Sequence, residues 1–354
     1  MKPDLPAMPR AVTPDDDSLR YVERLLDTLD PPVDGNSIAT ASRTLTRALP
    51  SLPQPGQGAT LLRWRMLAAI AARDLSLVKI YEAHADAAAI LAELGAAPPR
   101  RGTVWAVWAA QMPGAAVRAG QRSGDLVRLS GTKAWCSGAA FATDALVTCS
   151  DADDRPWLAA VELAQPGVEV VARGWHAVGM AATGSVDVLF DDAAARLVGP
   201  ANAYLERPGF WFGAAGIAAC WYGAAAALAT RLAVAAARRD DPHQRAHLGA
   251  ADAALSAARA LLRETAREID RAPTADAMAA ALRVRAAVES AVDAVTRATA
   301  RGLGAAPFCR DPWFARMAAD LPVFVRQSHA EHDLAVLGGA LADSATTERA
   351  AWSL

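Results

Sequence analysis

The sequence predicts an α+β protein in which helices precede and follow a central β-domain. Three observations support this prediction. Apolar residues recur at three- and four-residue steps over much of residues 1–101, as in amphipathic helices. Short runs rich in Val, Thr and Trp, separated by turn residues, fill residues 102–204. Long Ala-rich helical patterns occupy residues 205–354, and the chain, 53% hydrophobic, is long enough for two or three domains.

The first segment predicts four helices behind a polar, proline-rich lead-in of about 15 residues, which we expect to be loosely ordered. Proline and glycine mark where helices end, because proline lacks a backbone N–H and glycine readily adopts the left-handed conformation of helix ends. On this basis the helices run from Asp16 to the Pro31–Pro32 pair, then up to the loop 52–58, over 59–73 and over 75–94.

The middle segment predicts an antiparallel barrel or sandwich. The runs that read as strands are TVWAVWAAQ, LVRLSGTKAW, ALVTCS, WLAAVEL, VEVVARGW and SVDVLFDD. Turn residues such as Ser123–Gly124–Asp125 separate them, and Ser130–Gly131 reads as a further turn. No long helical period interrupts these runs, so the sheet is expected to be antiparallel.

The last segment predicts a four-helix bundle, with helices over about 211–237, 243–271, 274–301 and 311–338. The first of these could be mistaken for a membrane span, but it contains Trp221, Thr230 and Arg231 and is dominated by small residues. A helix buried among other helices is therefore predicted, with no membrane as partner.

Charge and cysteine usage exclude several classes of protein. The formal net charge is −2 and the basic residues are scattered, so no nucleic-acid partner is expected. Four widely spaced cysteines form no CxxC pair, and the polar N-terminus does not resemble a secretory signal. A cytoplasmic protein with reduced thiols is the expectation.

Three stretches of the chain are distinctive when they are taken in order. The first, LSGTKAWCSG, is similar to an L-x-G-x-K-x-W-x-S/T segment, and the second is GWHAVGMAATGSVDVLFDD. The third is YLERPGFWFGAAGIAACWYGAAAALA. Together they resemble the acyl-CoA dehydrogenase family, and the likeness covers nearly the whole chain. It implies an N-terminal helical domain (1–101), a β-domain (102–204) and a C-terminal four-helix bundle (205–354).

The resemblance also implies FAD as the cofactor, held between the β-domain and the bundle. Trp135 and Ser137 match the positions that flank the flavin ring in that family, with Cys136 between them. A Trp face can stack on a flat ring, and a hydroxyl with its adjacent backbone N–H can hydrogen-bond flavin N5 or O4. The alternative for Trp135 is an aromatic residue that covers the core of a sheet.

Two segments depart from the family's flavin-binding pattern. In WAAQMPGAAVRA, Gln111 replaces the usual Thr but can still hydrogen-bond a pyrimidine edge. In the same stretch Arg118 lies where the family has a Gly-Ser-Asp turn, and it either meets a phosphate or is a solvated surface residue. The loop ARRDDPHQRAHLG lacks the family's Arg-x-x-Phe-Gly, so Arg238 and Arg245 either bind the flavin phosphates or solvate the loop.

The catalytic Glu of the family's commonest branch is missing. It follows an Arg-Asp pair, here Arg310–Asp311, and its position holds Ala319. Asp320 is a candidate base, although it projects about 100° away around the helix. Glu264 is a candidate on another bundle helix, and a solvated helix face with i,i+4 charges also explains it.

His329, His332 and Asp333 form the densest polar cluster, and we expect them on one face of a continuous helix. The segment resembles the flavin-dependent monooxygenases that share the fold, in which a bundle histidine serves reduced-flavin oxygen chemistry. His329 is therefore a candidate for proton transfer, since an imidazole ordinarily titrates near pH 6.5. No distant ligand motif accompanies the cluster, so no metal site is expected.

Three functions are consistent with the sequence. The first is an acyl-CoA dehydrogenase-like oxidoreductase, a homodimer or homotetramer that removes the α-proton of an acyl thioester and passes a hydride to FAD. The second is a non-enzymatic subunit of the same fold that supports an active partner. The third is a monooxygenase that uses free reduced flavin.

Overall fold

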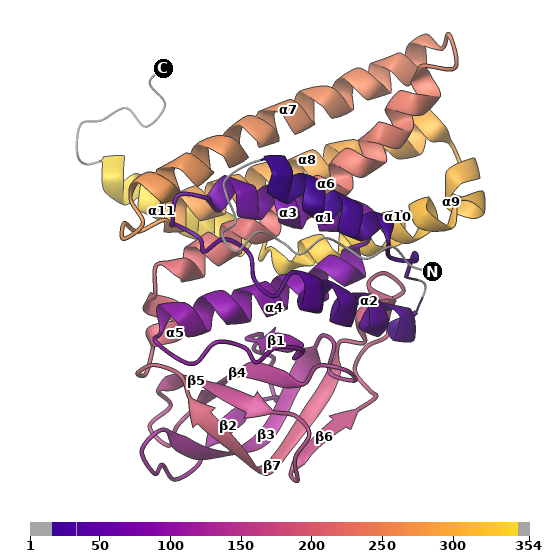
Figure 1. Cartoon of the computed structure of the whole chain (residues 1–354). Coiled ribbons are helices and arrows are strands. Elements are labelled where there is room, and N and C mark those ends of the chain that lie inside the picture. The colour runs from indigo at the N-terminus through magenta and orange to yellow at the C-terminus, as the bar shows by residue number, and fades with distance from the viewer. Residues whose placement is uncertain (1–15, 33, 346–354) are drawn as a thin grey trace. The chain divides into compact units, whose positions relative to one another are not determined.

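A computed structural model describes residues 16–32 and 34–345 of the chain (Figure 1). The lead-in of about 15 residues that the sequence predicts lies outside the described residues. The described residues fall into two compact units. Residues up to 54 together with 73–210 form the first unit, and residues 55–72 together with those from 211 onwards form the second.

The first unit contains three long helices, which the sequence predicts within a few residues at each end: α1 (Asp16–Asp27), α2 (Gly35–Ala48) and α4 (Leu75–Glu93). Two aspartates begin helices by accepting orphan backbone N–H groups. Asp34 accepts from the Ser37 N–H at 2.8 Å, and Asp74 accepts from the Leu77 N–H at 2.8 Å. A short helix, α5 (Ala203–Glu206), ends the unit.

Seven strands form the sheet of the first unit: β1 (Trp105–Trp108), β2 (Val117–Ala119), β3 (Leu126–Cys136), β4 (Asp144–Ser150), β5 (Pro156–Glu162), β6 (Val168–Val171) and β7 (Val186–Leu197). Five of them close into a barrel, because β4 pairs with β2, β2 with β3, β3 with β7, β7 with β5, and β5 again with β4. β1 pairs with β4 and β6 with β7 outside this ring.

The prediction of a purely antiparallel sheet is wrong. β1 and β2 both run parallel to β4, whereas the other pairings are antiparallel. Parallel neighbours need a long connection, and the chain between β1 and β4 provides one by first building β2 and β3. Alternation of side chains is the same in both kinds of pairing, so the sequence pattern did not separate them.

Gly131 lies within a strand and not in a turn, which corrects a second prediction. β3 runs through it, and the register against β7 shifts between Leu129 and Gly131, as in a β-bulge. The backbone of Gly131 has φ +122°, and a Cβ at this position would lie 2.1 Å from the Ala116 carbonyl oxygen. Only glycine fits so close an approach of β2 to β3.

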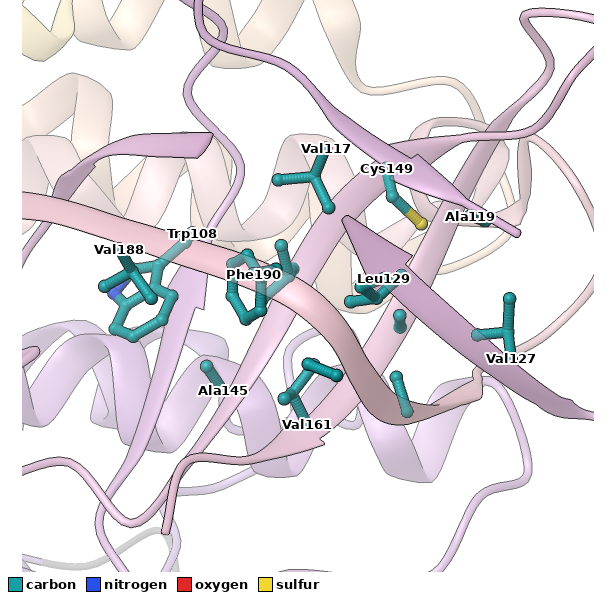
Figure 2. Close-up of a cluster of buried hydrophobic side chains, with 14 of the residues drawn as sticks. Trp108, Val117, Ala119, Val127, Leu129, Ala145, Cys149, Val161, Val188 and Phe190 are labelled. Carbon is teal, nitrogen blue, oxygen red and sulfur yellow. The ribbon is translucent and has the colours of Figure 1, made fainter. Parts of the chain in front are cut away.

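The core of the barrel is made of apolar side chains that range in size from Ala to Trp (Figure 2). Leu129, Val188 and Phe190 contribute from the paired strands β3 and β7, and Ala145 contributes from β4. Each fully buried Val, Leu or Phe side chain contributes about 1.5–3 kcal/mol of transfer free energy. A five-stranded barrel is narrow, so its interior is a packed core.

Helix α4 covers β1 on one side of the barrel (Figure 1). Ile90 and Leu91 of α4 pack in one cluster with Trp105 and Leu146. His84 adds a polar link, because its Nδ1 accepts from the Trp105 N–H at 3.2 Å while its Nε2 lies 3.1 Å from the Pro50 carbonyl. Burial lowers the pKa of His84, so this imidazole is a neutral structural link.

The second unit is helical. Its elements are α3 (Thr60–Arg73, whose last residue belongs to the first unit), α6 (Gly209–Ala236, from residue 211), α7 (Pro242–Arg271), α8 (Met278–Leu303), α9 (Ala306–Arg310), α10 (Pro312–Phe324) and α11 (Glu331–Ala345). The sequence predicts one helix over 311–338, and the structure corrects this. A 3₁₀ turn over Val325–Gln327 and an extended Ser328 separate α10 from α11.

Helix α6 forms the core of the second unit. A Cβ at Gly223 would lie 2.2 Å from the Ala68 carbonyl oxygen, so glycine allows α6 and α3 to approach closely. Among the described helices, α6 is the one long and apolar enough to cross a membrane, but 67% of its most apolar stretch is buried. A buried core helix passes the same test of length and composition.

Candidate functional site

Trp135 occupies a second bulge near the end of β3. Lys133 pairs with Val188 and Cys136 with Val186, so β3 carries one more residue than β7 between these pairs. Trp135 has φ +58°, in the left-handed region, and its indole is 46% exposed although both neighbours are buried. A bulky residue in this conformation costs on the order of 1–2 kcal/mol. The bulge therefore holds a large aromatic ring in solvent at an energetic cost, which the alternative of a core-covering aromatic does not explain.

Ser137 follows the bulge and begins a chain of three hydroxyl groups. Its Oγ lies 2.8 Å from Ser185 Oγ, which in turn lies 2.8 Å from Thr183 Oγ1. Thr183 Oγ1 donates to the Met180 carbonyl oxygen at 2.7 Å. Ser185 and Thr183 are buried, whereas Ser137 is half-buried. Ser137 is therefore the accessible end of a buried polar chain.

The backbone around Ser137 is fixed by the fold. The Ser137 carbonyl accepts from Trp108 Nε1 at 3.1 Å, and its N–H donates to the Trp135 carbonyl at 3.0 Å. The Gly138 N–H donates to the Thr183 carbonyl at 2.8 Å. These N–H groups have partners within the chain, so the Ser137 hydroxyl is the better placed of the two groups for a ligand, and a ligand contact from an N–H beside it stays a prediction.

Cys136 and Gln111 differ in their surroundings. The Cys136 thiol is fully buried in the barrel core and donates to the Lys133 carbonyl at 3.2 Å, and burial raises its pKa. A thiol in that position is protonated and shielded from any ligand at the surface of the barrel. Gln111 is exposed on the loop between β1 and β2, where it can contact a ligand.

The arginines considered for phosphate binding are mostly paired with carboxylates. Arg118 donates to Asp154 at 2.5 Å and to Ser150 Oγ at 3.1 Å, which identifies it as a surface residue that ties a loop. Arg245 pairs with Asp240 at 2.7 Å. Arg238 is exposed just beyond the end of α6.

The carboxylates considered as catalytic bases lie in different environments. Glu264 is exposed on α7 and pairs with Arg267 at 3.3 Å, as expected of a solvated helix face. Asp320 is buried on α10, one residue beyond Ala319. Asp311, of the Arg-Asp pair, caps α10 by accepting the N–H groups of Trp313 and Phe314, each at 3.1 Å. The structure does not bring these carboxylates together.

The imidazoles of His329 and His332 share the Asp333 carboxylate. Asp333 Oδ1 lies 3.3 Å from His329 Nδ1 and 3.7 Å from His332 Nδ1, and the two rings meet edge to face. His329 precedes α11 and is not inside a continuous helix, which corrects the prediction of one helical face. The Asp333 carboxylate instead holds His329 near α11, because it accepts a hydrogen bond from the His329 backbone N–H at 3.2 Å.

This arrangement suits proton transfer. Both imidazoles are about three quarters exposed, whereas Asp333 is mostly buried. A carboxylate beside Nδ1 favours the tautomer that carries its proton there, which leaves Nε2 with a free lone pair. An exposed Nε2 oriented in this way can accept a proton from a reacting group and later return it.

Arg285 lies beneath the turn that carries His329, and it was not among the residues predicted from the sequence. It is buried on α8, where it donates to the Gln327 carbonyl at 2.7 Å and to the Ala214 carbonyl at 2.8 Å. Its guanidinium lies 4.8 Å from the centre of the Trp221 ring. The one available signal was an arginine on the apolar face of ALRVRAAVES, where charged residues are rarely buried without partners.

Comparison with known proteins defines the fold. No family model matches the sequence, and no curated protein matches it. The structure resembles TdsC from Paenibacillus sp. A11-2, a dibenzothiophene monooxygenase solved with FMN and indole, with a TM-score of 0.72 and 18% identity over 92% of this chain and 96% of that one. The chain therefore has the acyl-CoA dehydrogenase-like fold of such flavin-dependent monooxygenases.

Two further structures support the same assignment of the fold. A nitrososynthase from Micromonospora carbonacea var. africana has a TM-score of 0.71 and 17% identity, over 92% of this chain and 95% of that one. The methanesulfinate monooxygenase MsuC from Pseudomonas fluorescens has a TM-score of 0.68 and 16% identity, over 95% of this chain and 96% of that one. The order of helices, β-domain and helices predicted from the sequence is confirmed.

Proposed function

We propose that this protein is a flavin-dependent monooxygenase, which was the third of the functions considered from the sequence. The observation that carries the proposal is the His329–Asp333–His332 cluster, an exposed proton-transfer group in a chain whose usual catalytic Glu position is Ala319. Two of the solved structures that share the fold, TdsC and MsuC, are monooxygenases, and this favours oxygenation over acyl-CoA dehydrogenation.

A flavin ring fits the residues around Trp135. The exposed indole offers a flat apolar face, and the half-buried Ser137 hydroxyl next to it offers a polar contact at the ring edge. Gln111 is accessible for the pyrimidine side of the ring, as the sequence analysis suggests. We propose that Trp135, Ser137 and Gln111, all in the first unit, hold the flavin ring. Arg238, in the second unit, stays a prediction from the sequence for a phosphate contact.

FMN is the flavin that we propose, in place of the FAD implied by the resemblance. TdsC is solved with FMN. In this chain the loop after α6 lacks the Arg-x-x-Phe-Gly segment through which many acyl-CoA dehydrogenases reach the FAD of a neighbouring subunit, and Arg245 in that loop pairs with Asp240. The loop after α6 therefore offers few residues to bind the second phosphate and the adenosine group of FAD.

Reduced flavin, when bound, would supply two electrons to dioxygen, so that one oxygen atom enters the substrate and the other leaves as water. Within this scheme His329 accepts a proton at Nε2 and returns it, and Asp333 holds the opposite nitrogen. Trp135 and Ser137 orient the ring. The substrate is a small molecule that accepts an oxygen atom.

The test begins with flavin titrations of the purified protein. We expect binding of reduced FMN, measured anaerobically by fluorescence, and oxygen consumption when a flavin reductase supplies reduced FMN with a panel of sulfur, nitrogen and aromatic substrates. Tight FAD that is bleached anaerobically by an acyl-CoA would instead establish the dehydrogenase. A chain that binds neither flavin in either redox state would be the non-enzymatic partner subunit.

Homodimeric or homotetrameric assembly remains part of the proposal. Light scattering coupled to gel filtration measures it directly, and a monomer at all concentrations would contradict it. The cytoplasmic location also remains a prediction from the sequence.

A further inference from the structure

The three hydroxyl groups that end at Ser137 have a defined direction of hydrogen bonding. Thr183 Oγ1 lies 2.7 Å from the Met180 carbonyl oxygen, and two oxygens so close require a proton between them. A carbonyl has no proton to give, so Thr183 donates. Its single hydroxyl proton is thereby used, and Thr183 can only accept from Ser185, which lies 2.8 Å away.

The same constraint on hydroxyl protons fixes the direction of hydrogen bonding at Ser137. Ser185 uses its one proton on Thr183, so at the 2.8 Å contact with Ser137 the proton comes from Ser137. Ser137 Oγ then has no proton left for another partner and keeps only its lone pairs. Burial of Ser185 and Thr183 excludes water as an alternative donor or acceptor. Ser137 is therefore a fixed hydrogen-bond acceptor.

A fixed acceptor discriminates between the two redox states of a flavin. N5 of the oxidised ring carries a lone pair and accepts hydrogen bonds, whereas N5 of the reduced ring carries an N–H and donates. A hydroxyl that can only accept pairs with the reduced ring and sets lone pair against lone pair with the oxidised ring. Hydrogen bonds to flavin nitrogens are among the means by which a protein tunes the cofactor's electronics.

We propose that Ser185, oriented by Thr183, is a positioning residue that makes Ser137 select reduced over oxidised flavin. The proposal rests on the proposed function, in which Ser137 contacts the flavin ring. It assigns a role to two residues that touch no flavin themselves. It also explains why a buried chain of hydroxyls ends at this half-buried serine.

The decisive variant is Thr183→Val, which removes a hydroxyl that does not contact Ser137. Without its acceptor, Ser185 can turn its proton to Ser137, and Ser137 can donate outward. We expect the ratio of the dissociation constants for oxidised and reduced FMN to fall about fivefold, the size of one neutral hydrogen bond. The midpoint potential of bound FMN, measured by anaerobic redox titration, should fall correspondingly.

Three further variants separate this effect from damage to the fold. Ser185→Ala frees the Ser137 proton directly and should lower the ratio as Thr183→Val does. Thr183→Ser keeps the hydroxyl and should restore the wild-type ratio and potential. Ser130→Ala is the matched control, because it removes an exposed hydroxyl from the same strand and should leave the ratio unchanged. Thermal melts identify any variant that is not folded.

The outcomes are distinguishable. If wild type binds FMN but the ratio and the potential are the same in folded Thr183→Val and Ser185→Ala, the proposal is wrong while the flavin site stands. Loss of the ratio in Ser130→Ala as well would also overturn it. If wild type binds no FMN in either state, the proposed function fails and the positioning role fails with it.

Discussion

The ammonium group of Lys133 lies 2.7 Å from Thr148 Oγ1 and 3.2 Å from the Thr148 carbonyl, inside the first unit and only 4% exposed. Among the residues that the structure describes, Lys133 forms no ion pair with a carboxylate. The thiols of Cys136 and Cys149 are its nearest ionisable neighbours, and burial raises the pKa of Cys149 to about 12, so that thiol stays neutral at ordinary pH. The barrel therefore contains a cation whose hydrogen-bond partners, within the described part of the chain, are the two neutral oxygens of Thr148.

This lysine predicts a contribution to folding stability that rises with pH above about 8; above about pH 9 the buried thiols of Cys136 and Cys149, whose pKa burial raises, oppose it. Burial lowers the pKa of Lys133 from 10.5 to about 8. Between these values the unfolded chain holds the proton and the folded chain does not, so the free energy of unfolding increases with pH, by at most about 3 kcal/mol. Below pH 8 both states are protonated and the full cost of burying the charge remains.

Urea titrations of wild type and Lys133→Met at pH 7.5, 8.5 and 9.5 measure this contribution as the difference between the two proteins, in which the effect of the thiols cancels. Lys133→Met, which keeps the volume but carries no proton, should lack the increase. A Lys133→Met variant with the same pH slope as wild type would assign the slope to other groups.

We expect a strong loss of folding stability when Arg285 is replaced, although Arg285 is not one of the residues proposed to contact the flavin. Arg285→Met removes a buried guanidinium that donates to two backbone carbonyls and stacks on Trp221, so we expect a loss of about 2–4 kcal/mol. Arg283→Met, on the exposed side of the same helix, should change stability by less than about 0.5 kcal/mol. Denaturant unfolding of both variants measures this, and equal losses would contradict the role of Arg285.

The order of helices and strands could be predicted from the sequence, because long periodic patterns of apolar residues do not depend on how the elements pack against one another. The helices over 59–73 and 75–94 are confirmed within one residue at each end. The three-residue strand β2 was missed, since so short a strand shows no alternation. The break before α11 was missed because Ala330, with φ +47°, is an ordinary helix former in a conformation that only tertiary contacts stabilise.

Site residues could be predicted only where a chemically suitable side chain lies in a segment that resembles a known family. Trp135, Ser137 and His329 belong to segments that the resemblance to known flavoproteins identifies. The hydrogen bonds that join Ser137, Ser185 and Thr183 depend on how β7 lies against β3. No local sequence pattern indicates these contacts. The same holds for Cys136, whose burial follows from a bulge one residue away.

Trp135 predicts opposite effects on folding and on flavin binding. Asparagine tolerates the left-handed conformation better than tryptophan, so Trp135→Asn should leave the free energy of unfolding unchanged or raise it by up to about 1 kcal/mol. Loss of the exposed aromatic face should weaken FMN binding about tenfold, as for a lost stacking contact. Trp135→Phe keeps a flat ring and should bind FMN nearly as well as wild type. Chemical denaturation and fluorescence titration measure the two effects, and weaker folding with unchanged FMN affinity would mean that the indole only packs.

His329 predicts a loss of turnover that leaves FMN binding intact. Removing a positioned proton-transfer group lowers rates by about 10²–10⁴, so His329→Gln should reduce substrate oxygenation by that factor while the dissociation constant for reduced FMN stays the same. Asp333→Asn removes the charge beside Nδ1 and should reduce turnover in the same direction.

Glu264→Gln serves as the matched control for His329, because Glu264 was also a candidate from the sequence but is exposed and paired with Arg267. It should oxygenate substrate at the wild-type rate. The measurement is the amount of oxygenated product formed per flavin oxidised, determined by chromatography. Hydrogen peroxide, the competing product of flavin oxidation, is measured in the same reactions. If His329→Gln and Asp333→Asn retain full coupled turnover while Glu264→Gln or Asp320→Asn abolishes it, the proton passes through a carboxylate of the bundle and the imidazole pair has another purpose.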